Sequence, residues 1–469
     1  MKNSHLIVIL NTFSKKEVRE LRKWLASPAH NQREDVVDLF EYLMSNNRIN
    51  SEKHLRKEKI FSKLFPKEPF DDAKLRQTMH FLLKSVEEFL IYQEQREDQV
   101  RSKMALATVF RKRKLGKAFR KTMKNVEGLQ ENAPFRNEHF LRNEYLLEQE
   151  KYAYLENQKR NIPMNLQEVS DALDTTYFAD KLRQSCLMLA HQKVFKAEYK
   201  IGLLDEVLEY VEKEDYLEVP AIVIYYYGYQ AFTNPNREEY FHKLREVVDH
   251  HGHLFPKSEI RDIYLMSINY CIGKINAGNR AFIRESFEIY RRGFGQKILI
   301  ENNNISRWTF LNVIRIAFSL KELDWVADFV ETNQQYLDAK HRESIVLYSQ
   351  AHLNFEKRDY DKAMSLLVHV DFDDVLLNLY AKVLLIQMYY ALEELDALES
   401  LLESMRTYIH RKQLMGSHDL IYRNIIRYTR KLIRLNPYDA KQKDKLREEI
   451  EGAKGLQIKG WLLEQLEAA

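Results

Sequence analysis

Apolar side chains recur every three or four positions through most of the chain, which is the period of an amphipathic helix. In the first hundred residues this spacing predicts four helices, and the longest places Leu75 and Leu82 on one face. Ser14 and Glu17 have the spacing of a capping box, which marks the start of the first of these helices. We therefore expect residues 1–99 to form a four-helix unit of their own.

Two long helices are expected next, within residues 100–165. The first runs from about 100 to 130, with a nick expected near Gly116, and the second covers about 136 to 160. A connection through residues 132–134 would make them an antiparallel pair.

From about residue 170 the pattern repeats. Long amphipathic segments end at intervals of 37 to 46 residues, and each is followed by a polar break and a further amphipathic segment. The long segments end near Phe195, Phe232, Ile272, Phe318, Phe355 and Leu392. Two helices per repeat and no strand are typical of stacked helical hairpins that share one continuous core. The sequence therefore predicts an α-solenoid over residues 166–415 and a helical cap over residues 416–469.

The repeat is clearest between residues 307 and 407. Residues 358–363 read Arg-Asp-Tyr-Asp-Lys-Ala, a turn followed by a small residue on the next helix, and Ala351 is the small residue of the preceding helix. Residues 322–326 and 394–398 occupy the corresponding positions in the flanking repeats. This stretch resembles tetratricopeptide repeats, a family built from helical hairpins.

A helical array offers an extended surface, so we expect a non-enzymatic scaffold or adaptor that binds a partner protein or peptide. The groove positions of the tetratricopeptide pattern, carried onto this chain, imply six partner-binding residues. They are Trp308, Arg315, Tyr348, His352, Gln387 and Tyr390. Several combine aromatic area with a polar tip, as interface anchors do. Ordinary packing between repeats is the alternative role for each of them.

Composition limits the other fold classes and sites. The 469 residues include only 13 Gly and 9 Pro, too few for many β-hairpins or for Gly-rich phosphate loops, so an all-α fold is expected. Cys186 and Cys271 lie in apolar helical patterns and are expected to be buried thiols. The histidine cluster at residues 250–253 has no cysteine near it in the sequence and is typical of an exposed loop. We expect no metal and no cofactor.

Catalytic and targeting motifs are missing from the sequence. It contains no G-x-S-x-G, Walker A or G-x-G-x-x-G motif, although a helical enzyme whose groups meet only across the fold remains the least favoured alternative. The apolar run from Leu6 to Leu10 is too short for a signal peptide. No segment approaches the roughly 18 apolar residues of a membrane helix. We therefore expect a cytoplasmic protein without a transmembrane segment.

Charge is spread unevenly along the chain. The formal net charge is +4, yet residues 101–125 hold ten Lys or Arg and no Asp or Glu. The candidate basic patch comprises Arg111, Lys112, Arg113, Lys114, Lys117, Arg120, Lys121 and Lys124. Such a stripe suits a nucleic-acid phosphate backbone, which is the alternative function, or an acidic protein or anionic membrane surface. The simpler interpretation is a solvated face, or an internal match to the acidic helix of residues 138–156.

Overall fold

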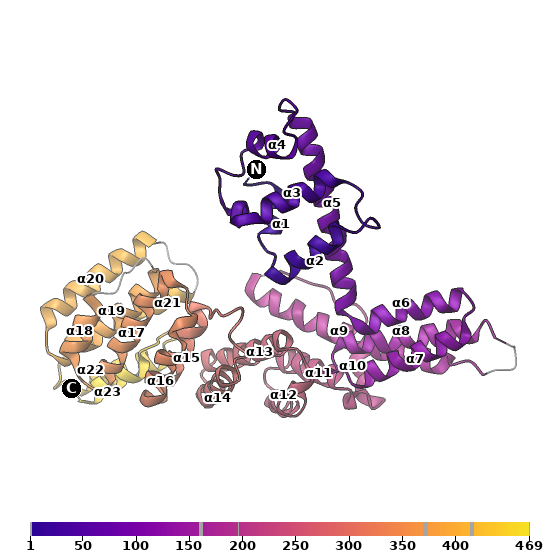
Figure 1. Cartoon of the computed structure of the whole chain (residues 1–469). Helices are drawn as coiled ribbons and strands as arrows, with labels where there is room; N and C mark the ends of the chain where they lie inside the picture. Colours follow the sequence, from indigo (N-terminus) through magenta and orange to yellow (C-terminus); the bar gives the residue numbers. More distant parts are fainter. Residues whose placement is uncertain (1, 159–162, 196, 369–373, 413–416, 469) are drawn as a thin grey trace. The chain divides into compact units, whose positions relative to one another are not determined.

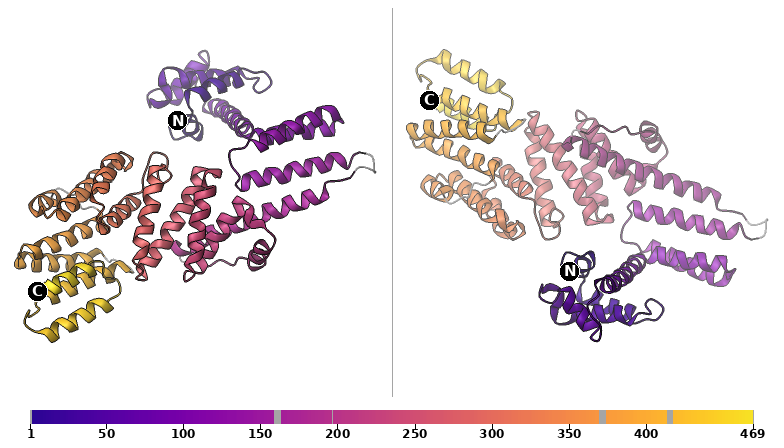
Figure 2. Two further views of the ribbon diagram at one scale, coloured as in Figure 1. Left: turned by 90° about the horizontal axis from the view of Figure 1, so that it is seen from below. Right: turned by 90° about the horizontal axis from the view of Figure 1, so that it is seen from above.

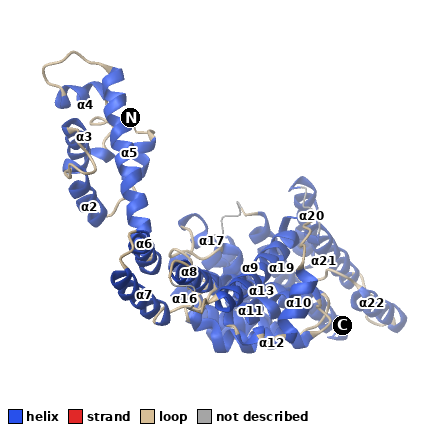
Figure 3. Cartoon of the chain, turned by 90° about the vertical axis from the view of Figure 1, so that its right-hand side faces the viewer, coloured by secondary structure: helices blue, strands red, loops and turns tan. Residues whose placement is uncertain are grey.

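The computed structural model describes residues 2–158, 163–195, 197–368, 374–412 and 417–468. Every regular element in these ranges is a helix and none is a strand, which confirms the all-α class (Figure 3). Among the described helices, none combines the length and the hydropathy needed to cross a bilayer. The chain divides into two compact units, Met1–Tyr177 and Phe178–Ala469 (Figure 1). The boundary expected after residue 415 falls within 413–416, outside the described residues.

The first unit begins with helices that pack around one hydrophobic core. They are α1 (His5–Leu10), α2 (Lys15–Leu25), α3 (Glu34–Met44), α4 (Lys57–Leu64) and α5 (Asp72–Glu97), with a 3₁₀ helix at Ser45–Asn50. The capping box is confirmed, because the Ser14 hydroxyl accepts from the Glu17 N–H and the Glu17 carboxylate accepts from the Ser14 N–H. The four expected helices are present, and the apolar run at the N-terminus adds α1, whose Leu6 and Leu10 are buried in this core.

Three helices follow where two were expected. They are α6 (Gln99–Lys112), α7 (Gly116–Glu131) and α8 (Glu138–Leu155). The chain reverses at Lys114, which has a φ of +60°, and the Leu115 N–H bonds to the Phe110 carbonyl at 2.9 Å. The expectation of one helix nicked near Gly116 is therefore wrong: the nick is a full turn, so α6 and α7 form a hairpin on which α8 packs. A lysine in the left-handed conformation carries no glycine signal that would have revealed the turn.

The second unit consists mostly of consecutive helix pairs. The first helices of the pairs are α11 (Pro220–Thr233), α13 (Lys257–Asn276), α15 (Arg307–Ser319), α17 (Ala339–Glu356) and α19 (Val375–Ala391). The second helices are α12 (Glu238–His251), α14 (Ala281–Gly295), α16 (Leu323–Asn333), α18 (Tyr360–Val368) and α20 (Leu395–Lys412). These pairs are preceded by α9 (Leu166–Phe195) and α10 (Leu204–Lys213), and followed by α21 (Ser417–Ile433), α22 (Ala440–Gly452) and α23 (Lys459–Ala468). Each of the six long segments expected from the sequence is a helix, and each of these helices ends within four residues of the expected position. The six expected helices are therefore confirmed.

First helices of successive pairs also pack on one another. The structure places α11 against α13, α15 against α17, and α17 against α19 (Figure 2). In four of the pairs, one residue of the connecting turn has a left-handed backbone conformation. These residues are Gly278, Lys321, Arg358 and Glu393, one in each pair from α13–α14 to α19–α20. The next N–H bonds back into the first helix, as from Glu322 to the Ala317 carbonyl at 3.0 Å. Because three of these four residues are not glycine, the hairpins form despite the low glycine content.

Buried side chains confirm the expectation for the two cysteines. Cys186 and Cys271 are buried free thiols, and burial raises the pKa of both, in the case of Cys271 to about 12. Tyr225 and Tyr226 are buried in α11, while Tyr227 is only half-buried. These three consecutive tyrosines therefore belong to a largely buried helix whose edge reaches the surface.

Candidate protein-binding surface

The facing sides of α15, α17 and α19 carry a series of polar contacts that we call the first-helix seam. It comprises Arg307, Arg315, Phe318, His341, Tyr348, His352, Glu356, Asp374 and Tyr380. The helices run parallel, because residues near the start of one contact residues near the start of the next. His341 lies 34 residues after Arg307, which it contacts, and Tyr380 lies 65 residues after its partner Arg315.

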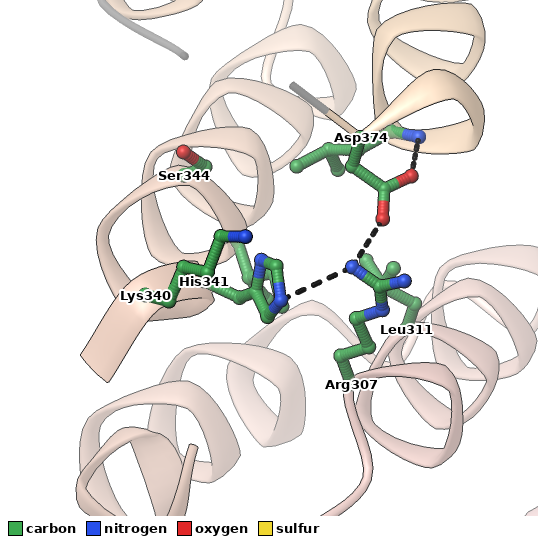
Figure 4. A pocket seen from close by; sticks show the side chains of 8 residues that line it. Arg307, Leu311, Lys340, His341, Ser344 and Asp374 are labelled. Carbon is green, nitrogen blue, oxygen red and sulfur yellow. Dashed lines mark hydrogen bonds and ion pairs between the residues drawn. The ribbon is translucent and has the colours of Figure 1, made fainter. Parts of the chain in front are cut away.

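Arg307 ties together the N-terminal ends of all three helices. Its Nη1 atom lies 2.7 Å from Oδ2 of Asp374 and 3.2 Å from Nε2 of His341 (Figure 4). Asp374 precedes α19, and its carboxylate also accepts from the N–H groups of Leu376 and Leu377. One acid thus caps a helix and neutralises a cation contributed by another helix.

A cavity of about 90 Å³ opens at this end of the seam. Its lining residues are Arg307, Leu311, Lys340, His341, Ser344, Ile345, Asp374 and Leu377. Lys340 is exposed at the start of α17. Next to the cavity lining, the Arg307 guanidinium lies 4.6 Å from the ring centre of Trp308, whose side chain is 39% exposed. One residue of the cavity lining therefore stacks on an exposed indole, and the lining has more cations than anions.

The middle of the seam is a closed cluster. Arg315 Nη1 donates to the Tyr380 hydroxyl at 3.0 Å, and its guanidinium lies 4.4 Å from the Tyr380 ring centre. The Tyr348 ring lies 6.2 Å from that of Tyr380, and burial raises the pKa of Tyr348 far above its ordinary value. Burial likewise raises the pKa of Tyr422 in α21, which lies close enough for Tyr380 and Arg315 to affect it. The middle cluster thus belongs to the interior of the second unit.

The C-terminal end of the seam holds a largely buried histidine, His352, whose side chain is 15% exposed. The His352 ring stacks on Phe318 with centroids 3.7 Å apart, and its Nε2 lies 3.7 Å from Oε1 of Glu356. Burial lowers the pKa of His352 even though Glu356 opposes that shift. Burial would raise the pKa of Glu356, but its contacts with His352 and Lys321 outweigh burial and lower it. This group also contributes to packing between helices.

The six residues implied by the tetratricopeptide pattern therefore occupy different environments. Arg315, Tyr348 and His352 make the internal contacts described above. Tyr390 packs edge-on against Trp461 of α23 with centroids 5.3 Å apart, and Gln387 is half-buried. Trp308 is the most exposed of the six. No sequence signal indicated Arg307, His341 and Asp374, since they lie more than thirty residues apart and form no local motif.

The basic patch lies on the α6–α7 hairpin, and only part of it is matched internally. Arg111 Nε lies 2.6 Å from Oε1 of Glu150, and this hydrogen bond raises the pKa of Arg111. Arg120 donates to the Tyr154 hydroxyl at 2.8 Å. The other six cations are exposed, and none of them forms an ion pair or hydrogen bond with a residue that the structure describes. They are Lys112, Arg113, Lys114, Lys117, Lys121 and Lys124. Among the eight cations of the patch, only Arg111 thus forms the expected ion pair with an acid of α8 that the structure describes.

Other titratable clusters are structural in character. The Tyr225 hydroxyl donates to Glu259 at 2.5 Å, and Arg183 Nε lies 3.8 Å from the same carboxylate. Both Tyr225 and Glu259 are buried, so this contact joins α11 to α13 and is closed to a substrate. Within the described ranges, no three His, Cys, Asp or Glu side chains are grouped so as to hold a metal ion.

Comparison of the chain with family models, with curated proteins and with solved structures gives no match. The function therefore has to be argued from the side chains of this chain.

Proposed function

We propose that the protein is a non-enzymatic scaffold that binds a partner protein or peptide at the N-terminal end of the first-helix seam. The observation that carries this proposal is the exposed Trp308 ring beside a cavity of about 90 Å³. Tryptophan and arginine are enriched among the few residues that carry most of the binding energy at protein interfaces. Trp308 and Arg307 already stack here, so little side-chain entropy is lost when a partner covers them.

The arrangement of the helix pairs supports the same proposal. Pairs of helices joined by tight turns, with first helices packed on first helices, make a tetratricopeptide-like α-solenoid the finer description that we favour. The 34-residue step from Arg307 to His341 equals the period of that family, which is about 34 residues. Arrays of this kind use the surface of their first helices for binding.

Charge identifies the kind of segment that fits. Arg307, Lys340 and His341 line the cavity together with one acid, Asp374, which already neutralises Arg307. The exposed Lys340 has no anionic partner among the described residues. A partner segment that places an apolar side chain on Trp308 and a carboxylate near Lys340 would complement both features.

The test is capture of a partner by the full chain. Tagged wild-type protein and the W308A/K340A variant are incubated with extract of the source cells, and retained proteins are quantified by mass spectrometry. We expect the variant to lose at least about tenfold of the specifically retained partner, as removal of a hot spot predicts. Purified partner should then reproduce the loss in a two-component binding assay.

Tyr438→Ala is the matched control, because Tyr438 is 97% exposed and belongs to the same unit but lies outside the seam. It should retain the partner as wild type does. Equal retention by wild type and W308A/K340A would show that this surface is not used. Circular dichroism and melting curves must show that both variants remain folded.

A further inference from the structure

The α6–α7 hairpin presents a surface of seven cations that we call the basic hairpin surface. Its members are Lys112, Arg113, Lys114, Lys117, Arg120, Lys121 and Lys124, all exposed. The first three lie at and beside the turn, and the last four follow one face of α7 at helical spacing. The buried residues Phe119, Met123 and Val126 occupy the opposite face, so the orientation of the stripe is fixed by the core.

Tyr154 of α8 holds the start of α7 in place. Its ring stacks on Phe119 with centroids 4.1 Å apart, and its hydroxyl accepts a hydrogen bond from Arg120. A Cβ at Gly116 would lie only 3.0 Å from that hydroxyl, so glycine permits the close approach. The cations therefore project from a packed three-helix element.

Nearby acids do not neutralise this surface. Glu150 is committed to Arg111, and Glu156 also acts on Arg111. Glu127, on α7 itself, pairs with Lys151 at 2.9 Å. Lys117 moreover lies in the first turn of α7, where the helix dipole is unfavourable for a cation. A bound external anion would offset this unfavourable interaction between the cation and the helix dipole.

We infer that the basic hairpin surface binds the phosphate backbone of a nucleic acid without reading its bases. Protein interfaces have an apolar centre and few lysines, whereas residues 112–124, which hold this surface, include five lysines and one exposed large apolar side chain, Leu115. Insertion into a membrane interface would also need aromatic or clustered apolar side chains, and Phe119 is buried. Regularly spaced phosphates need only cations, and none of the seven side chains is fixed by an acid.

The test uses the full chain with a fluorescein-labelled single-stranded RNA and a DNA duplex, each of about 20 nucleotides or base pairs, in fluorescence anisotropy titrations. Affinity should fall at least tenfold between about 50 and 200 mM salt, because each neutralised phosphate contributes about −0.7 to −0.9 to the log–log slope. K117E/K121E/K124E should weaken binding by at least about tenfold at low salt. K117Q/K121Q/K124Q should reduce the slope by about 2 to 3.

K59E/K63E/K67E is the matched control, since it makes the same change in net charge at exposed positions in and after α4. It should leave affinity within about twofold of wild type if a local surface is responsible. An equal loss in both charge-reversal variants would overturn the inference, because it would show a general effect of net charge. Absence of binding to both nucleic acids at about 50 mM salt would also overturn the inference. In that case the wild type is sedimented with vesicles of phosphatidylcholine and phosphatidylserine. Sedimentation with the vesicles, without binding to nucleic acid, would assign the surface to a membrane instead.

Discussion

Arg307 in the first-helix seam and Lys117 on the basic hairpin surface are both cations in the first turn of a helix, where the dipole disfavours positive charge. Arg307 has an anionic partner at 2.7 Å, and Lys117 has none among the described residues. The same contrast holds for the rest of each region. Arg315 donates to Tyr380 and Lys321 pairs with Glu356, whereas none of the seven cations of the basic hairpin surface is paired with an acid that the structure describes.

The difference separates charges that maintain the fold from charges that are available to a ligand. Cations of the seam link helices through contacts between residues 34 and 65 positions apart in the chain, so removing them should cost stability. The five lysines of the basic hairpin surface contact no acid that the structure describes, so removing them should leave stability unchanged or improve it. Variants in the two regions test this separation directly.

The largest loss is expected for Asp374→Ala. It removes the cap of α19 and leaves a partly buried arginine unpaired, which together should lower the free energy of unfolding by about 2 kcal/mol. Tryptophan fluorescence during urea unfolding is a suitable measurement, because Trp308, Trp325 and Trp461 all lie in the second unit. Asp439→Ala removes the cap of α22, which has no such cation, and should cost about 1 kcal/mol. Equal losses would show that the Arg307 pair adds nothing.

Tyr380→Phe should lower the free energy of unfolding by about 1 kcal/mol, because it deletes the hydrogen bond from Arg315 and keeps the ring. Tyr438→Phe, at an exposed position, should have no measurable effect in the same unfolding assay. A variant at position 380 as stable as wild type would mean that water replaces the hydroxyl without cost.

Within the hairpin itself, Arg111→Ala should be more harmful than Lys117→Ala. Arg111 and Glu150 are both largely buried, at 21% and 12% side-chain exposure, so the loss should be about 1 kcal/mol. Lys117→Ala should change the free energy of unfolding by less than about 0.5 kcal/mol. The change should be an increase, because the substitution removes a cation from the first turn of a helix. Hydrogen exchange of α6 and α7 amides would measure both variants in this unit. A larger loss at Lys117 would contradict the division between paired and free cations.

The last expected effect is a dependence of seam stability on pH. Burial lowers the pKa of His352, so the unfolded chain binds its proton first as pH falls below the ordinary value of 6.5. The free energy of unfolding should therefore decrease with acidification from 6.5 down to the lowered pKa of the folded state. The lowered pKa of Glu356 extends the loss to pH values below 4.5. In His352→Phe the first part of this dependence should disappear, and the second should become smaller because Glu356 loses one of the two contacts that lower its pKa. Unchanged titration curves would contradict the assignment.

Local patterns in the sequence predicted the helices well. Helical periodicity placed the ends near Phe232 and Phe355 correctly, and the spacing of Ser14 and Glu17 identified a real capping box. These features depend on residues within one or two turns of each other, which a single sequence displays directly. The turn at Lys114 was missed because the residue in the left-handed conformation is not glycine.

Contacts between distant residues could not be predicted in the same way. Nothing near Arg307 indicates that Asp374 and His341 will lie beside it, because no local motif links residues so far apart. The basic stretch was evident from composition, but which of its cations would be neutralised depended on the position of Glu150 on another helix. The exposure of Trp308 and the burial of Tyr348 likewise depend on the register in which helices α15, α17 and α19 pack against one another.

The turns between paired helices have a consequence for how this kind of chain can diverge. Lysine, arginine and glutamate occupy left-handed positions at 321, 358 and 393, each at a conformational cost of about 1 kcal/mol relative to a relaxed backbone. The backbone hydrogen bonds that close each turn do not depend on the side chain. Substitutions can therefore accumulate at these positions without opening a hairpin, and homologues would share the bonding pattern of the turn while differing in its residue. A search for relatives by invariant glycines would overlook them.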